Sequence, residues 1–257
     1  MTAKYNSIEY ENVSGVARIN LNRPPLNVLD IAMMKEIVQA TEEAQKDPAV
    51  KLLVIAGKGK AFSGGVDVAD HTADKVDAMT EVFHKMCTSI IKFPQPTVAI
   101  VNGHALGGGC ELAISCDMVI ASEAARIGQP EIKLGVFPPI AAIVMPQIIG
   151  RKKALELILT GDVITAAEAY RIGLVNHVVA PEKLEETAMN FIEKLSMLSG
   201  IVMKYTKQAC YAGLDGDYDA VLKKVEDIYL HKLMKTHDAA EGLKSFMEKR
   251  QAAWTNK

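Results

Sequence analysis

Two glutamates twenty residues apart, Glu111 and Glu131, are the side chains of this 257-residue sequence best suited to do chemistry. Glu111 follows a glycine triplet at 107–109, and Glu131 ends a Gly-Gln-Pro-Glu segment that starts at Gly128. Two carboxyl groups that converge on one pocket can divide a proton between them and hold a water, while nearby glycines let bare amide N–H groups reach a substrate carbonyl. Spacing alone does not prove that the two glutamates converge.

Glycines stand at two places where an oxyanion hole could form. Gly64 and Gly65 follow the apolar run 52–56, at the exit of a predicted strand, although a plain tight turn is the alternative for a Gly-Gly pair seen alone. The triplet 107–109 opens a predicted helix, whose unpaired amides and positive dipole end suit a developing enolate oxygen. Three glycines weaken a helix start by about 0.5–1 kcal/mol each, which is easier to understand if a ligand approaches closely.

Each glutamate also has an ordinary structural interpretation. Glu111 could be a solvated helix carboxylate, but the apolar run 112–114 argues against full exposure. Apolar neighbours would raise the pKa of Glu131 and let it act as an acid near neutral pH. A capping role, or an ion pair with Lys133 or Arg126, is equally compatible with its spacing.

Strands and helices alternate over the first half of the sequence. The pattern predicts strands at 16–21, 52–56, 97–101 and 118–121, and helices at 30–45, 73–91 and 108–115. From about residue 152 helices dominate, with a capping-box start at Thr165 and amphipathic candidates at 181–198, 203–213, 218–234 and 239–253. This order predicts an α/β core over 1–195 and a helical subdomain over 196–257, whose apolar faces either pack internally or form subunit contacts.

Composition excludes several function classes. A formal charge of −2 gives no concentrated basic surface, so neither a nucleic-acid nor a membrane partner is predicted. The N-terminal residues carry no signal or transit pattern, which predicts a cytoplasmic protein.

The four cysteines form no CxxC pair and the histidines no HExxH pattern, so we expect reduced, mostly buried cysteines and no metal. Neither GxxxxGK[ST] nor GxGxxG spacing occurs, so no nucleotide cofactor is predicted.

Taken together, the motifs resemble the crotonase, or enoyl-CoA hydratase/isomerase, superfamily. The matching stretches keep the family order over nearly the whole chain and lie at 22–24, 61–67, 101–112, 116–117, 128–131 and 159–161. The resemblance implies an α/β superhelical core of repeated β-β-α turns with a C-terminal helical region that trimerises, often into a hexamer of two trimers. It also implies a hydro-lyase that needs no separate cofactor, because coenzyme A is part of the substrate.

The resemblance also assigns roles to residues. It implies that the backbone N–H groups of Val66 and Gly108 hold the carbonyl of an acyl-CoA thioester, while Glu111 and Glu131 hold the water, one mainly as base and the other supplying the α-proton. Phe246 and Lys249 match C-terminal positions that can touch CoA across a trimer. The predicted CoA- or substrate-binding residues are Ser63, Gly64, Asp67, Val68, His71, Pro139, Phe246 and Lys249.

Three departures from the family pattern bear on the substrate. Pro139 and Ile140 stand where a small, glycine-rich stretch is usual, Val66 replaces a residue of alanine size, and the turn at 23–26 is one residue short and lacks a lysine that often meets the CoA phosphate. The stretches 67–71 and 136–139 most resemble the cyclic dienoyl-CoA hydratases, which hydrate cyclohexa-1,5-diene-1-carboxyl-CoA in anaerobic aromatic degradation.

Two alternatives stay open. One is a short-chain enoyl-CoA hydratase or isomerase of fatty-acid β-oxidation, which would use the same site. The other, of a different class, is a non-catalytic acyl-CoA- or RNA-binding protein of the same fold. The presence of both glutamates and the lack of a lysine-rich helix favour an enzyme.

Overall fold

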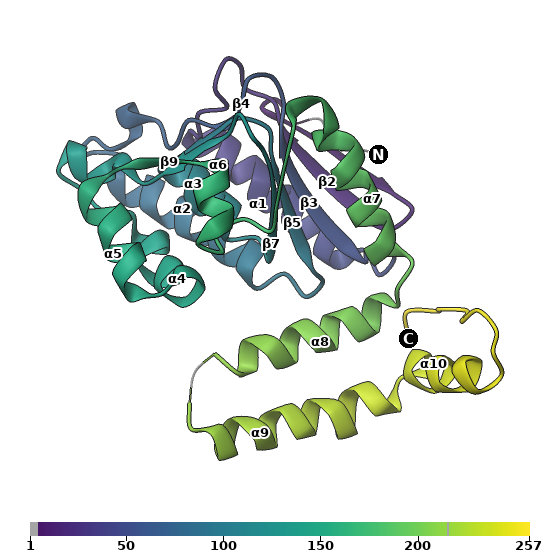
Figure 1. The fold of residues 1–257 in the computed structure, drawn as a ribbon. Helices are drawn as coiled ribbons and strands as arrows, with labels where there is room; N and C mark the ends of the chain where they lie inside the picture. The colour runs from purple at the N-terminus through teal and green to yellow at the C-terminus, as the bar shows by residue number, and fades with distance from the viewer. Residues whose placement is uncertain (1–4, 215) are drawn as a thin grey trace.

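The core of the protein consists of two β-sheets, seen in a computed structural model that describes residues 5–214 and 216–257 (Figure 1). The larger sheet has the order β1 (Ile8–Val13), β2 (Val16–Leu21), β3 (Leu52–Gly57), β5 (Thr97–Val101), β7 (Met118–Ser122) and β10 (His177–Val179). The smaller sheet has the order β4 (Ala61–Ser63), β6 (His104–Leu106), β8 (Arg126–Gly128) and β9 (Val163–Thr165). All neighbouring strands pair in parallel except β1 with β2 and β8 with β9.

From β3 to β8, consecutive strands alternate between the two sheets, and this makes the repeated unit. β3, β5 and β7 lie in the larger sheet, and each is followed by a short strand, β4, β6 or β8, of the smaller one. A helix then returns the chain: α2 (Val76–Ile91) after β4, α3 (Gly108–Ile114) after β6 and the 3₁₀ helix η2 (Pro130–Leu134) after β8. The turns between the paired strands of successive units pack closely. A Cβ atom on Gly103 would lie only 2.1 Å from the Lys60 carbonyl oxygen. The predicted β-β-α core is confirmed.

Helices cover both faces of the larger sheet, so its central strands are buried throughout. Helix α1 (Ile31–Lys46) begins where Asp30 accepts a hydrogen bond of 2.8 Å from the Met33 N–H, and it packs with α2 over one face. On the other face, α7 (Leu184–Ser196) packs Leu184 and Ile192 against the apolar side chains of β3, β5 and β7. A strand with both faces covered reads as a continuous apolar run, which explains why β3 and β5 could be predicted.

The remaining helices extend the core and form a separate layer. Beside the smaller sheet lie α4 (Pro139–Ile149), α5 (Arg151–Thr160) and α6 (Ala166–Arg171). The C-terminal layer, below the core in Figure 1, contains α8 (Gly200–Ala212), α9 (Tyr218–Asp227) and α10 (His237–Met247). Short helical turns occur at η1 (Val68–Asp70), η3 (Pro181–Lys183), η4 (Ile228–Lys232) and η5 (Leu233–Lys235). No helix in the described ranges has the length and apolar character needed to cross a membrane.

Several predicted boundaries and elements differ from the structure. Helix α2 begins at Val76 rather than 73, and the last predicted helix ends at Met247 because Lys249 takes a positive φ of 53°. Helices dominate after residue 152 as expected, but the sequence pattern did not predict β9 and β10, which add a strand to each sheet. The proposed division after residue 195 stays a prediction, although α7 ends at Ser196 and α8 belongs to the separate layer.

Candidate active site

Both glutamates lie in the wall of one cavity of ≈ 260 Å³, beyond the ends of β4 and β6. The cavity is bounded by the two glycine turns, helix α2, η2 and the start of α4. Its lining includes the predicted residues Gly64, Val66, Val68, His71, Gly108, Glu111, Glu131 and Pro139. The structure therefore brings the two carboxyl groups together, which their spacing could not establish.

Glu111 stands in the first turn of α3 with only 3 % of its surface exposed. Its Oε1 accepts hydrogen bonds from the backbone N–H groups of Ile140, at 2.8 Å, and Ala141, at 3.0 Å. These amides belong to the first turn of α4, so the carboxyl group also faces the positive end of a helix. Burial is the dominant influence and raises the pKa of Glu111 to about 7; the two amides oppose the rise and the charge of Glu131 adds to it.

Glu131 lies in η2, and its carboxyl group is so close to residue 107 that only a glycine fits there. A Cβ atom on Gly107 would lie 2.7 Å from Glu131 Oε1, and Gly107 has a φ of 53°, so a side chain there would be excluded both by space and by backbone conformation. Burial raises the pKa of Glu131 to about 7. Among the described residues neither Lys133 nor Arg126 forms an ion pair with Glu131, which removes the salt-bridge alternative.

The amide groups of Val66 and Gly108 lie next to each other at the same wall. Val66 forms an isolated parallel bridge with Leu29. In this bridge the Leu29 N–H donates to the Gly65 carbonyl oxygen at 2.8 Å, and the Asp67 N–H donates to the Leu29 carbonyl oxygen at 2.9 Å. The Val66 N–H therefore points away from Leu29. In the part of the chain that the structure describes, neither the Val66 nor the Gly108 N–H donates to a protein acceptor. A Cβ atom on Gly108 would lie 2.6 Å from Val66 Cγ2, so the two turns are in direct contact.

Some predicted binding residues lie outside the cavity wall. Ser63 is fully buried, and its hydroxyl accepts a 3.2 Å hydrogen bond from the Gly65 N–H, so it supports the turn from beneath. Asp67 accepts from the Ala69 N–H at 3.0 Å and caps η1. Phe246, which is 83 % exposed, and Lys249 belong to the C-terminal layer and do not line this chain's own cavity. Contacts of all four with CoA stay predictions.

Sequence reasoning missed the contribution of helix α2 to the site. Val76, Met79, Thr80, Phe83 and His84 follow one another around one helix face and line the cavity. Their three- and four-residue spacing was visible in the sequence, but a helix face with that spacing is usually core, and nothing local says that part of it borders a cavity.

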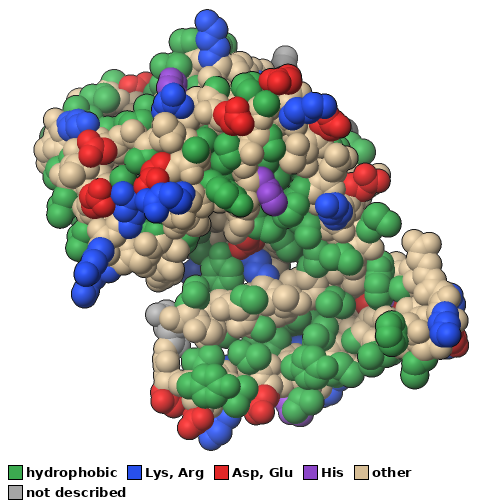
Figure 2. All heavy atoms as spheres, viewed as in Figure 1, with side chains coloured by type: hydrophobic (Ala, Val, Ile, Leu, Met, Phe, Trp, Pro, Cys, Tyr) green, Lys and Arg blue, Asp and Glu red, His purple; other side chains and the backbone are tan. Residues whose placement is uncertain are grey.

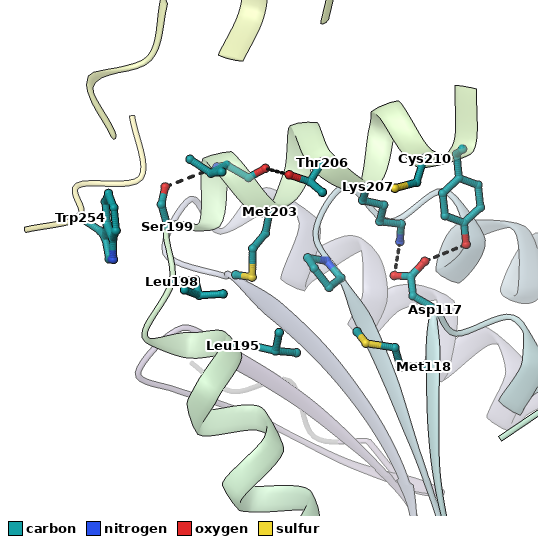
Figure 3. Close-up of a pocket in the computed structure, with 13 residues that line it drawn as sticks. Asp117, Met118, Leu195, Leu198, Ser199, Met203, Thr206, Lys207, Cys210 and Trp254 are labelled. Atoms are coloured by element: carbon teal, nitrogen blue, oxygen red, sulfur yellow. Dashed lines mark hydrogen bonds and ion pairs between the residues drawn. The ribbon is translucent and has the colours of Figure 1, made fainter. Parts of the chain in front are cut away.

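A larger cavity, of ≈ 710 Å³, lies between the core and α8 (Figure 3). It is lined mainly by apolar side chains, among them Met118, Leu195 and Met203. Its two charged groups, Asp117 and Lys207, are paired with each other at 2.7 Å. Because these charges neutralise one another, the candidate active site is the smaller cavity, whose two carboxyl groups form no ion pair with any described residue.

Comparison with known proteins agrees with this geometry. The family model described as enoyl-CoA hydratase/isomerase matches residues 11–257. The chain belongs to this family. A probable mitochondrial enoyl-CoA hydratase of Dictyostelium discoideum is 38% identical over 255 residues, which cover 96% of this chain and 90% of the relative. The cyclohexa-1,5-dienecarbonyl-CoA hydratase of Thauera aromatica is 35% identical over 248 residues, covering 96% and 95% of the two chains.

The fold of the enoyl-CoA hydratase/isomerase family recurs in solved structures. The crystal structure of an enoyl-CoA hydratase from Bacillus anthracis superposes with a TM-score of 0.93 at 31% identity, covering 98% of this chain and 100% of the other. The predicted fold class and the predicted enzyme class, a hydro-lyase of the enoyl-CoA hydratase type, are confirmed.

Proposed function

We propose that the protein adds water across the double bond of an α,β-unsaturated CoA thioester in the ≈ 260 Å³ cavity, with Glu111 and Glu131 holding the water and the N–H groups of Val66 and Gly108 holding the thioester oxygen. The observation that carries the proposal is a buried and a half-buried carboxyl group, both with a pKa raised to about 7, beside two amides that have no protein acceptor among the described residues. Near neutral pH such a pair supplies both an ionised and a protonated carboxyl group.

The proposed reaction follows from these four groups. The ionised carboxylate takes a proton from the water, whose oxygen bonds to the β-carbon, and the protonated carboxyl group gives its proton to the α-carbon. Negative charge builds on the thioester oxygen between these events, where the two amides stabilise it. Losing one donor of this kind commonly costs about 10²–10³ in rate. Because the two carboxyl groups interact, their protons belong to the pair, and we assign the base to neither alone.

We further propose a cyclic dienoyl-CoA as the substrate. The relative from Thauera aromatica is named for this activity. We expect the lining by Pro139, Val66 and Phe83 to favour a compact, flat acyl group. Pro139 occupies the first turn of α4, directly before the two amides that hold Glu111, so it forms a rigid wall. Val66 and Phe83 line the same cavity, and their side chains lie close to Gly108.

A comparison of two substrates tests the substrate class. We expect a higher kcat/KM for cyclohexa-1,5-diene-1-carboxyl-CoA than for crotonyl-CoA, measured as loss of the conjugated thioester absorbance. Faster hydration of crotonyl-CoA would contradict the cyclic assignment and favour a short-chain enoyl-CoA hydratase. A shift of the double bond without uptake of water would favour an isomerase. Binding of both thioesters without turnover would favour the non-catalytic alternative.

We also propose that the protein assembles as a homotrimer, or as a hexamer of two trimers, through the C-terminal layer. Large hydrophobic side chains gather along this layer in Figure 2, and Tyr218, Phe246 and Met247 are each at least 75 % exposed. Because Phe246 and Lys249 do not line this chain's own cavity, we expect them to reach CoA in a neighbouring subunit. A cytoplasmic location stays a prediction.

A further inference from the structure

Gln129 is a fully buried polar residue directly behind the candidate active site. It lies between the last residue of β8 and the first of η2, and none of its surface is exposed. It does not line the cavity, so it cannot reach a substrate there. A buried amide must find hydrogen-bond partners on both its oxygen and its nitrogen, because an unsatisfied polar group costs about 1–3 kcal/mol.

The surroundings of Gln129 fix the orientation of its side-chain amide. Three acceptors lie 3.2 Å from one end of that amide: Glu131 Oε1, Glu131 Oε2 and the Gly107 carbonyl oxygen. Only donors surround the other end. The nitrogen, which carries two N–H donors, therefore faces Glu131 and Gly107, and this orientation is assigned from the hydrogen-bond network.

The Gly107 oxygen connects Gln129 to the proposed oxyanion donor. The carbonyl of Gly107 and the N–H of Gly108 belong to one planar peptide group, so their directions are fixed relative to each other. The oxygen also accepts a 2.9 Å hydrogen bond from the Glu111 N–H. Hydrogen bonds to a peptide oxygen polarise that peptide and strengthen its N–H as a donor. The Gln129 side-chain amide therefore contacts both the Glu131 carboxyl group and the peptide group that carries the proposed oxyanion donor.

We propose that Gln129 is a positioning residue that holds the Glu131 carboxyl group and the Gly107–Gly108 peptide in fixed relative positions, so that proton transfer and oxyanion stabilisation act on the same thioester. The inference rests on the proposed function of Glu131 and Gly108. It assigns Gln129 no direct contact with the substrate. Its effect reaches the reaction only through these two groups.

The first test replaces Gln129 by a side chain of similar length without donors. We expect Gln129→Met in the full-length protein to lower kcat for hydration of crotonyl-CoA by about 10–100-fold, with KM changed less than about 3-fold, because a displacement of about 1 Å at a reacting group has effects of this size. Thr41→Val is the matched control. Thr41 is equally buried, its hydroxyl donates to the Ile37 carbonyl at 2.8 Å, and neither residue lines the cavity.

The second test separates positioning from a general loss of structure. In the Glu131→Gln background the further cost of Gln129→Met should be smaller than in the wild type, because the part of the effect that acts through Glu131 is already lost, whereas the part that acts through the Gly107–Gly108 peptide remains. In the same background, bound cinnamoyl-CoA should show a smaller shift of its absorption to longer wavelength when Gln129 is replaced, because the carbonyl is less polarised. Equal costs in both backgrounds together with an unchanged shift would reduce Gln129 to a structural role and overturn the inference.

Further outcomes are also decisive. A Gln129→Met enzyme with kcat within about 3-fold of the wild type would overturn the inference. If this variant does not fold, Gln129→Leu also removes the donors without adding a charge, and normal turnover by that variant would equally overturn it. Normal turnover by Glu131→Gln alone would instead contradict the proposed function, which distinguishes the two failures.

Discussion

Two acidic residues at opposite ends of one short helix show how differently this protein treats a buried charge. Glu111, inside α3, accepts hydrogen bonds from two backbone N–H groups. Among the described residues no cation forms an ion pair with it. Asp117, just beyond α3, accepts from Lys207 Nζ and from the Tyr211 hydroxyl, each at 2.7 Å, and from Thr97. Figure 3 shows Lys207 reaching down from α8 to Asp117.

The difference separates a carboxyl group proposed to be catalytic, that of Glu111, from a structural one, that of Asp117. A cation within hydrogen-bond distance favours the ionised form of a carboxyl group, whereas burial with neutral donors leaves both forms accessible near neutral pH. Asp117 ties the C-terminal layer to the start of β7, while Glu111 remains free to exchange a proton in the cavity. The larger cavity, ≈ 710 Å³ against ≈ 260 Å³, is therefore the less reactive one.

The largest expected effect is on turnover. Glu111→Gln and Glu131→Gln should each lower kcat by about 10²–10⁴, the usual contribution of a general acid or base, while binding of the CoA ester persists. Steady-state hydration and a titration with a CoA thioester measure the two properties. Asp117→Asn is the matched control and should keep near-normal turnover per folded molecule. Near-wild-type hydration by either glutamine variant would remove that glutamate from the catalytic pair.

The next effect concerns the attachment of the C-terminal layer and therefore the stability of the protein. Asp117→Ala should lower the free energy of unfolding by about 3–4 kcal/mol, because it leaves the Lys207 ammonium, whose side chain is only 10 % exposed, without its partner. Urea unfolding measures the change. Adding Lys207→Met should restore much of the loss, since the unpaired charge is removed with its partner. A single variant as stable as the wild type would show that the ion pair does not hold α8 in place.

The smallest effect is the pH dependence of stability at Glu111. Because burial raises its pKa from 4.5 to about 7, the folded state binds the proton more tightly than the unfolded state between these values. The contribution of Glu111 to the free energy of unfolding is therefore fully present below about pH 4.5. It falls by about 2–3 kcal/mol as the pH rises through about 7.

Urea unfolding at pH 5 and pH 8 measures this linkage. Glu111→Gln has no such titration, so it should gain stability relative to the wild type between the two pH values. The Asp117→Asn variant is the control and should not reproduce this gain. If Glu111→Gln and the wild type lost stability in parallel over this range, the pKa of Glu111 would not be raised by folding.

Much of the fold could be predicted because its signals are local. The buried strands β3 and β5 are continuous apolar runs, and the helix start at Asp30 carries its own capping residue. The short strands β4, β6 and β8 were missed because three residues carry no measurable periodicity. Only their pairing in a second sheet makes them strands, and that pairing joins segments far apart in the sequence.

The sequence by itself determined the candidate reactive groups of this protein: two glutamates, each next to turns that contain glycine or proline, because the conformations of such turns depend on residue type. The tertiary structure decided that Glu111 and Glu131 meet. Strands β7 and β8 carry the chain away from α3 and return it to the same wall, where α4 supplies amides to Glu111 and Gln129 supplies one to Glu131. Burial, which raises both pKa values to about 7, exists only after that packing.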